Sequence, residues 1–164
     1  MFTLPPELKA QGEKAEAVFQ SWLNHSGVAY MYVEQSPLTV PTGLRGRIKR
    51  PDYIVGIPHA GSLAFDVKAK TVYDGHLILD LVEVEKLARF GRLFNMTAYF
   101  ACMDLEREDR HWWVPLDALQ SRTPERRGKR RVVTIPTDEA FEVPFDCSFL
   151  EAVLAYSLKS LGTD

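Results

Sequence analysis

The stretch KRPDYIVGIPHAGSLAFDVKAK, residues 49–70, places charged side chains inside a run of apolar ones. Asp52, Asp66 and Lys68 have aliphatic and aromatic neighbours, where an ionised group is costly unless it pairs with another charge or holds a metal. Because side chains alternate along a strand, Asp66 and Lys68 point to the same face. Two carboxylates that meet beside a lysine could bind Mg²⁺ or Mn²⁺, which prefer oxygen ligands.

A cation held in this way has a defined chemistry. It can polarise a phosphate and lower the pKa of a bound water, while Lys68 orients or deprotonates that water. The alternative is a structural ion pair between the lysine and the carboxylates. The Asp66-x-Lys68 triplet alone does not decide between a metal site and an ion pair, since about one acidic-x-Lys triplet is expected by chance in a chain of this length. Its context favours the metal, because Pro51-Asp52 opens the partner strand and an acidic helix precedes both.

A β-hairpin would bring these side chains together. A turn centred near His59–Gly61 pairs the two flanking segments antiparallel. Counting outward from that turn, Asp52 comes roughly level with Asp66 and Lys68. Residues 36–50, before the hairpin, have prolines, glycines and little periodicity, and loops of that length in compact domains are usually functional or mobile.

The segments upstream of that loop predict a helix and a strand. The helix ends at Gly27, a residue type that commonly follows the last helical turn. Its apolar stripe has helical spacing and consists of Ala15, Val18, Phe19, Trp22 and Leu23. Residues 28–35 are β-branched and aromatic enough to form a first strand.

Downstream of the hairpin, two capping boxes mark the starts of helices. Asp80 and Glu83 begin a helix over 80–95, and Ser148 and Glu151 begin a final amphipathic helix. The apolar positions of the final helix are Leu150, Val153, Leu154, Leu158 and Leu161. Further strands are expected at 97–103, 111–116 and 131–135. This order predicts a single mixed α/β domain over all 164 residues, with a central β-sheet flanked by helices.

Charge is distributed unevenly along the chain. The net charge of −2 does not suggest a nucleic-acid partner, but RGRIKR at 45–50 has four basic residues in six and RRGKRR at 126–131 has five in six. Either cluster alone could be a solvated loop. Two clusters that flank a candidate metal site favour phosphate binding. The candidate nucleic-acid-binding residues are Arg45, Arg47, Lys49, Arg50, Arg126, Arg127, Lys129, Arg130 and Arg131.

Composition excludes several classes of protein. Hydrophobic residues make up 46% and charged residues 26%, which is ordinary for a globular domain and argues against disorder. No apolar run is long enough to span a bilayer and residues 1–20 lack a signal-peptide layout, so a cytoplasmic location is expected. Cys102 and Cys147 lack metal-type spacing and the four histidines are scattered, so a zinc site is not expected.

Pro51-Asp52 followed by Asp66-Val67-Lys68 resembles the motif of the PD-(D/E)xK nuclease superfamily. The segment QGEKAEAVFQSWLNHSGV, residues 11–28, is similar to the opening helix of its Holliday-junction-resolvase-like branch, where a Gly-x-x-x-Glu pattern supplies an acidic residue. Gly12 and Glu16 match that pattern. The resemblance covers roughly residues 12–104 and implies a restriction-endonuclease-like fold.

The resemblance also implies roles for single residues. Asp52, Asp66 and the carbonyl of Val67 would ligate the metal. Glu16 would approach the metal or its water shell from the helix, and Lys68 would position the attacking water.

Three other positions keep two interpretations. The family often carries a further polar residue, commonly glutamine, on the helix after the lysine strand. In this sequence that position falls on or near Glu83, a glutamate that departs from the pattern. The role of Glu83 near the site therefore stays open.

Trp112 and Trp113 could stack on bases. Adjacent strand positions point oppositely, so at least one of them is expected in the core or an interface.

These inferences favour an Mg²⁺- or Mn²⁺-dependent endonuclease that hydrolyses phosphodiester bonds in DNA, with branched, mobile-element and repair DNA as candidate substrates. The first alternative is a nucleic-acid-binding module that keeps this fold with a weakened site. The second is a structural or interaction protein in which Asp52, Asp66 and Lys68 merely pair. The intact set of these three residues with Glu16 favours the enzyme. The sequence does not exclude RNA, and the resemblance implies that a homodimer could form.

Overall fold

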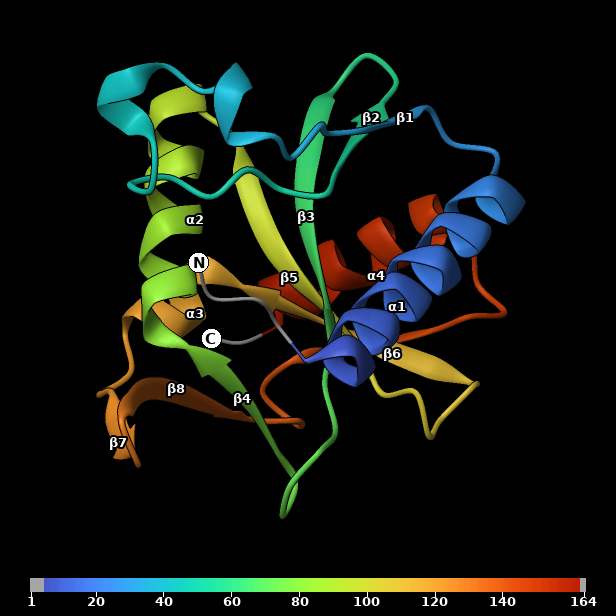
Figure 1. Cartoon of the computed structure of the whole chain (residues 1–164). Helices are drawn as coiled ribbons and strands as arrows, with labels where there is room; N and C mark the ends of the chain where they lie inside the picture. Colours follow the sequence, from blue (N-terminus) through green and yellow to red (C-terminus); the bar gives the residue numbers. More distant parts are fainter. Residues whose placement is uncertain (1–4, 163–164) are drawn as a thin grey trace.

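The computed structural model describes residues 5–162 and is built around a six-stranded β-sheet (Figure 1). Its strands are β1 (Tyr30–Tyr32), β2 (Tyr53–Ile57), β3 (Gly61–Ala69), β5 (Thr97–Met103), β6 (Arg110–Pro115) and β9 (Phe141–Pro144). They lie in the order β1-β2-β3-β5-β6-β9 across the sheet. β3 and β5 are parallel and the other neighbouring pairs are antiparallel, so the central sheet is mixed, as predicted.

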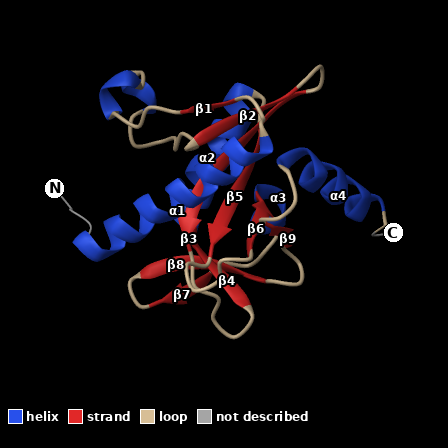
Figure 2. Ribbon diagram, turned by 90° about the vertical axis from the view of Figure 1, so that its right-hand side faces the viewer, coloured by secondary structure: helices blue, strands red, loops and turns tan. Residues whose placement is uncertain are grey.

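Helices cover both faces of this sheet (Figures 1 and 2). The helices α1 (Pro6–Ser26) and α4 (Phe149–Leu161) share a hydrophobic cluster with one face. The helices α2 (Leu81–Phe94) and α3 (Leu116–Gln120) pack with a second cluster on the other face. A small antiparallel sheet completes this second face; its strands are β4 (His76–Asp80), β8 (Arg130–Pro136) and β7 (Glu125–Arg127). The predicted fold class, a mixed sheet flanked by helices, is confirmed.

The alternation of side chains along β3 assigns the charged residues to a face. Phe65 and Val67 belong to the cluster under α1 and α4, whereas Ala64 belongs to the cluster under α2. By the same alternation, Asp66 and Lys68 point toward α2. The site therefore lies between the sheet and the start of α2.

Most predicted elements are present, and the hairpin turns where expected, with His59 and Gly61 at positive φ. β1 is shorter than the predicted strand over 28–35. Four elements were not predicted, namely β4, α3, β7 and β9. None exceeds five residues, and so short a segment has too few positions to display a period.

The final helix is present as predicted, but the face that it buries is not the predicted one. α4 begins with the predicted capping box of Ser148 and Glu151. Phe149 and Ala152 are its buried residues, whereas all four leucines that suggested the pattern are exposed, with Leu154 at 61%. A second apolar stripe beginning at Phe149 has the same helical period, and it carries the bulkier aromatic side chain into the core.

The described helices do not include a membrane-crossing candidate. No helix within residues 5–162 combines the length and the apolar character that a bilayer crossing requires.

Residues 111–116 were expected as a strand, and β6 covers most of them. Its two tryptophans are buried on opposite faces of the sheet, Trp112 under α2 and Trp113 under α1. Both tryptophans are therefore core residues and are not available to stack on bases.

Candidate active site

The β2–β3 hairpin positions the two aspartates. Tyr53 pairs with Phe65 in the register, and the Asp52 amide donates to the Phe65 carbonyl at 2.9 Å, so Asp52 stands opposite Asp66. The Asp52 carboxylate is 8% exposed, and its Oδ2 accepts a hydrogen bond of 2.7 Å from the Val67 amide. The residue between Asp66 and Lys68 thus fixes the carboxylate of Asp52. The predicted level arrangement of the two aspartates is present.

Asp66 is a fully buried carboxylate whose oxygens accept no hydrogen bond within the described structure. Each oxygen instead faces one lysine. Oδ2 lies 3.2 Å from Nζ of Lys68, and Oδ1 lies 3.3 Å from Nζ of Lys49. Lys68 was expected here, whereas Lys49 comes from the long loop before the hairpin. Because a buried carboxylate requires compensation, these two lysines stabilise Asp66 in its buried position.

Glu83 closes a ring of four charges. Its Oε1 lies 2.9 Å from Nζ of Lys68 and 3.3 Å from Nζ of Lys49. The predicted capping box at the start of α2 is therefore only half formed. Asp80 caps the helix by accepting from the Val82 amide at 2.9 Å, but the Glu83 side chain turns to the lysines. The stronger pull of two cations on a carboxylate explains why it does not reach back to its helix cap.

Two members of the ring, Glu83 and Lys68, have pKa values that their ring partners shift toward the charged form. Burial alone would raise the pKa of Glu83, but Lys68 and Lys49 outweigh it and lower that pKa to about 2. Burial alone would lower the pKa of Lys68, but Asp66 and Glu83 outweigh it and raise that pKa above its ordinary value. Lys68 is consequently an ammonium in this arrangement. It can donate hydrogen bonds to a water or a phosphate oxygen, and it cannot serve as a base while the ring is intact.

A second electrostatic feature is repulsion among the acidic groups. Burial and the nearby Asp66 carboxylate raise the pKa of Asp52 to about 7, against the lowering effect of the Val67 amide. Burial also raises the pKa of Glu16, while a hydrogen bond from Tyr32 opposes the shift and Asp66 adds to it. Three carboxylates that repel one another would gain from a shared cation.

A cleft of about 710 Å³ opens above the ring. Lys49, Lys68 and Glu83 line it together with six other charged residues, so that seven basic side chains face two acidic ones, Asp80 and Glu83. The basic residues are Arg45, Lys49, Arg50, Lys68, Lys70, Lys86 and Arg130. Such a surface attracts phosphate groups.

Comparison with solved structures identifies the architecture. Hjc from Archaeoglobus fulgidus, a Holliday junction resolvase from an archaeal hyperthermophile, aligns over 81% of this chain and 92% of its own, with a TM-score of 0.54 and 23% identity. The chain therefore has the fold of this resolvase. D212, a nuclease from a fusselovirus, aligns over 93% of both chains with a TM-score of 0.46 and 11% identity. No family model matches the sequence, and no curated protein matches it either.

The donor set at the PD-(D/E)xK position fits a hard divalent cation. Within residues 5–162, no three His, Cys, Asp or Glu side chains form a preassembled metal cluster. Mg²⁺ does not require one, since it usually takes one or two carboxylates and keeps several waters. Asp66 supplies two buried oxygens without hydrogen bonds, and Asp52 stands opposite it. These residues fit Mg²⁺ or Mn²⁺ chemically.

Glu16 approaches the site from the other side of the sheet. It lies in α1, half-buried, and the Tyr53 hydroxyl donates to its main-chain carbonyl at 3.4 Å. Its side chain forms no ion pair with Lys68 among the described residues, although both Lys68 and Asp66 influence its pKa. Glu13, one turn earlier, is exposed and pairs with Lys9 at 3.8 Å. Of the two glutamates, Glu16 is the one next to the site.

The two basic clusters contribute unequally to the cleft. Arg45, Lys49 and Arg50 from the first cluster line it, but only Arg130 does so from the second. The remaining basic residues of the second cluster are exposed on the β7–β8 hairpin; they are Arg126, Arg127, Lys129 and Arg131. Arg47 is exposed and donates to the Gly43 carbonyl at 3.4 Å.

The sequence interpretation did not include Lys70 and Lys86, and it did not place Lys49 beside Asp66. Lys70 follows Lys68 by two positions on β3, and Lys86 follows Glu83 by one helical turn, so periodicity alone could have placed both. The position of Lys49 beside Asp66 had no such signal. It depends on the path of the loop between β1 and β2, which local sequence does not specify.

Proposed function

We propose that this protein is a divalent-metal-dependent nuclease that hydrolyses phosphodiester bonds in DNA, with Mg²⁺ or Mn²⁺ as its cofactor. One observation carries the proposal. Asp66 is fully buried with two oxygens that accept no hydrogen bond from the described residues, and it lies beside Lys68 at a cleft that seven basic residues line. A hard-oxygen ligand, an ammonium and a phosphate-attracting surface are the parts that phosphodiester hydrolysis requires.

Each residue of the site has a distinct role in the proposed reaction. Asp52, Asp66 and the Val67 carbonyl would hold the ion, with Glu16 near its waters. The bound ion supplies Lewis acidity and a water of lowered pKa. Lys68 donates a hydrogen bond that orients this water and compensates the negative charge that develops on the phosphate. The attacking water would lose a proton to solvent as its oxygen bonds to phosphorus, the bond to the leaving sugar oxygen would break, and that oxygen would take a proton from solvent.

Branched DNA is the first substrate to test, because the structurally similar archaeal protein is a Holliday junction resolvase. The cleft itself supports contacts to the phosphate backbone, which are independent of sequence. We therefore expect structure-dependent or non-specific cleavage.

A binding module without catalysis is the second candidate. The observation in its favour is the closed ring, in which Lys49 and Lys68 already compensate Asp66 and Glu83. A satisfied ring does not require a metal. Under this alternative the protein binds DNA through its cleft and leaves it intact.

A cleavage assay separates the two candidates. The protein is incubated with labelled four-way junction, linear duplex, single-stranded DNA and RNA, each with Mg²⁺, Mn²⁺, Ca²⁺ or a chelator. We expect cleavage of at least one DNA form with Mg²⁺ or Mn²⁺, and binding with little turnover with Ca²⁺ because its geometry is looser. DNA binding without cleavage of any form under any metal would contradict the nuclease and support the binding module.

A further inference from the structure

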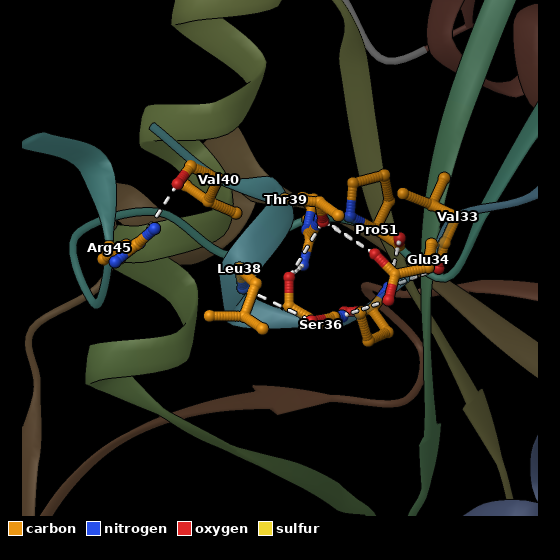
Figure 3. A network of polar contacts seen from close by, with 10 residues as sticks. Val33, Glu34, Ser36, Leu38, Thr39, Val40, Arg45 and Pro51 are labelled. Carbon is orange, nitrogen blue, oxygen red and sulfur yellow. Dashed lines mark hydrogen bonds and ion pairs between the residues drawn. The ribbon is translucent and has the colours of Figure 1, made fainter. Parts of the chain in front are cut away.

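Lys49 is held in the site by a folded loop, residues 33–51, which we call the strap. It crosses from β1 to β2 and carries two short 3-10 turns, Pro37–Thr39 and Thr42–Leu44. Figure 3 shows the polar network that folds it. The Glu34 carboxylate accepts from the Ser36 amide at 2.8 Å and from the Thr39 hydroxyl at 2.6 Å.

Arg50 locks this network next to Lys49. Its guanidinium donates to the Thr39 hydroxyl at 2.6 Å and to the Ser36 carbonyl at 2.7 Å, and its side chain is only 16% exposed. On the other side of Lys49, the Arg89 guanidinium donates to the Arg47 carbonyl. These contacts fix the backbone on both sides of Lys49.

The strap is also bonded directly to α2. The main-chain amide of Lys49 donates to the Lys86 carbonyl at 3.2 Å. In Figure 1 the short turns of the strap, drawn in cyan, lie beside α2, in agreement with this bond. The backbone of Lys49 is therefore tethered at the edge of the cleft, whereas its four-carbon side chain keeps its own rotatable bonds.

The ammonium of Lys49 lies next to Asp66 Oδ1, a carboxylate oxygen that a metal ion would use as a ligand. It lies 3.3 Å from Asp66 Oδ1 and 3.3 Å from Glu83 Oε1. Lys68 faces the other Asp66 oxygen. A divalent cation bound to Asp66 at the usual ligand distance near 2 Å would meet the Lys49 ammonium as a like charge at close range.

We propose that Lys49 is a tethered counter-cation, which compensates Asp66 and Glu83 while no divalent ion is bound and is displaced when one binds. This inference rests on the proposed metal site and assigns Lys49 a role that the motif does not contain. The displaced side chain stays at the cleft, since its backbone is held by the strap. There it can contact a phosphate, so metal loading and DNA binding support each other.

Titration with Mn²⁺ alone tests the proposal without DNA and without catalysis. Calorimetry is run on the wild type, on Lys49→Gln and on Lys86→Gln. Lys86 is the matched control, because it lines the same cleft but forms no ion pair among the described residues. Removing a competing unit charge a few ångströms from the ligand should tighten Mn²⁺ binding by about tenfold or more in Lys49→Gln, and by less than about threefold in Lys86→Gln.

Each outcome bears on the inference. Unchanged or weaker Mn²⁺ binding in Lys49→Gln, or equal tightening in both variants, overturns the role of Lys49 and leaves the metal site standing. Binding to Lys49→Gln but not to the wild type supports the inference in its strongest form. Absence of binding to all three proteins overturns both the inference and the proposed function. Lys49→Met repeats the measurement if thermal unfolding shows that Lys49→Gln is poorly folded.

Discussion

At the scale of single residues, the buried carboxylate of Asp66 determines which charged side chains must lie around it. A fully buried carboxylate without hydrogen bonds is unfavourable unless cations surround it, and Lys49 and Lys68 each face one of its oxygens. Glu83 then balances the two lysines. Lys68 has two carboxylate partners, and this keeps it an ammonium that can orient a water.

Substitutions at Asp66 and Lys68 should have different effects. Asp66→Asn keeps the shape but removes the anionic ligand, so both Mn²⁺ binding and DNA cleavage should be lost. Lys68→Ala leaves both aspartates in place, so Mn²⁺ should still bind while cleavage falls by about 10²–10³, the usual effect of losing one preorganised electrostatic contact. Calorimetry and single-turnover cleavage measure the two quantities. Equal cleavage by Lys68→Ala and the wild type would exclude the assigned role of the lysine.

Sequence reasoning found the local part of this site and missed the non-local part. Asp52, Asp66 and Lys68 belong to one hairpin, whose turn and alternation specify their relative positions. Glu83 was placed near the site but as half of a capping box, because local spacing cannot reveal the two lysines that attract it. Lys49 was assigned only to phosphate contacts, because its distance from Asp66 depends on how the whole strap folds.

At the scale of elements, the strap joins the first strand to the site. Arg50 was expected to contact phosphate, but its guanidinium is largely buried and engaged within the strap by Thr39 and Ser36. Its contacts are charge-assisted, and hydrogen bonds to charged groups contribute about 1.5–3 kcal/mol each. Arg50 therefore supports the position of Lys49, and its contact with phosphate stays a prediction.

Loss of Arg50 should loosen the strap. In Arg50→Met the Ser36 carbonyl loses one of its donors, and the Thr39 hydroxyl loses the guanidinium that donates to it. Trypsin should then cleave after Arg45, Arg47 and Lys49 at least about tenfold faster, because proteolysis follows the population of the locally open form. Arg110→Met is the control, since the Arg110 guanidinium also holds charge-assisted contacts, its ion pairs with Asp109 and Glu142, but on the β6–β9 edge. Mass spectrometry of early fragments identifies the cleaved bonds. The same strap cleavage rate in Arg50→Met and the wild type would contradict a structural role for Arg50.

The elements differ in how far their own sequence specifies them. α1 has a full apolar stripe and a glycine stop, and both were predicted correctly. α4 carries two apolar stripes, so its period predicted a helix but not the face that packs. β4 pairs with β8, more than fifty residues later, and its five residues carry no signal of that partner. Tertiary pairing determines such elements.

At the scale of the whole molecule, the arrangement of charge matters more than its sum. The chain has a net charge of −2, yet seven basic and two acidic side chains line one cleft. The fold produces this concentration by bringing the strap, β3, α2 and β8 to one place. A net charge close to zero therefore does not argue against a polyanionic partner here.

The salt dependence of DNA binding tests this concentration of charge. One variant replaces three cleft residues outside the ring by glutamine, namely Arg45, Lys86 and Arg130. A matched variant replaces three exposed residues of the β7–β8 hairpin that do not line the cleft, namely Arg126, Arg127 and Lys129. Each phosphate contact contributes about 0.9 to the slope of log affinity against log salt.

The cleft variant should therefore flatten that slope by about 2–3, and the hairpin variant by less than about 1. Fluorescence anisotropy with labelled duplex and Ca²⁺ gives the slopes without turnover. The two variants remove the same number of charges, so a difference between them reports where the phosphates lie and not the change in net charge. Equal flattening would extend the DNA path over the hairpin, as the second basic cluster first suggested. An unchanged slope in the cleft variant would contradict the assignment of this cleft as the DNA-binding surface.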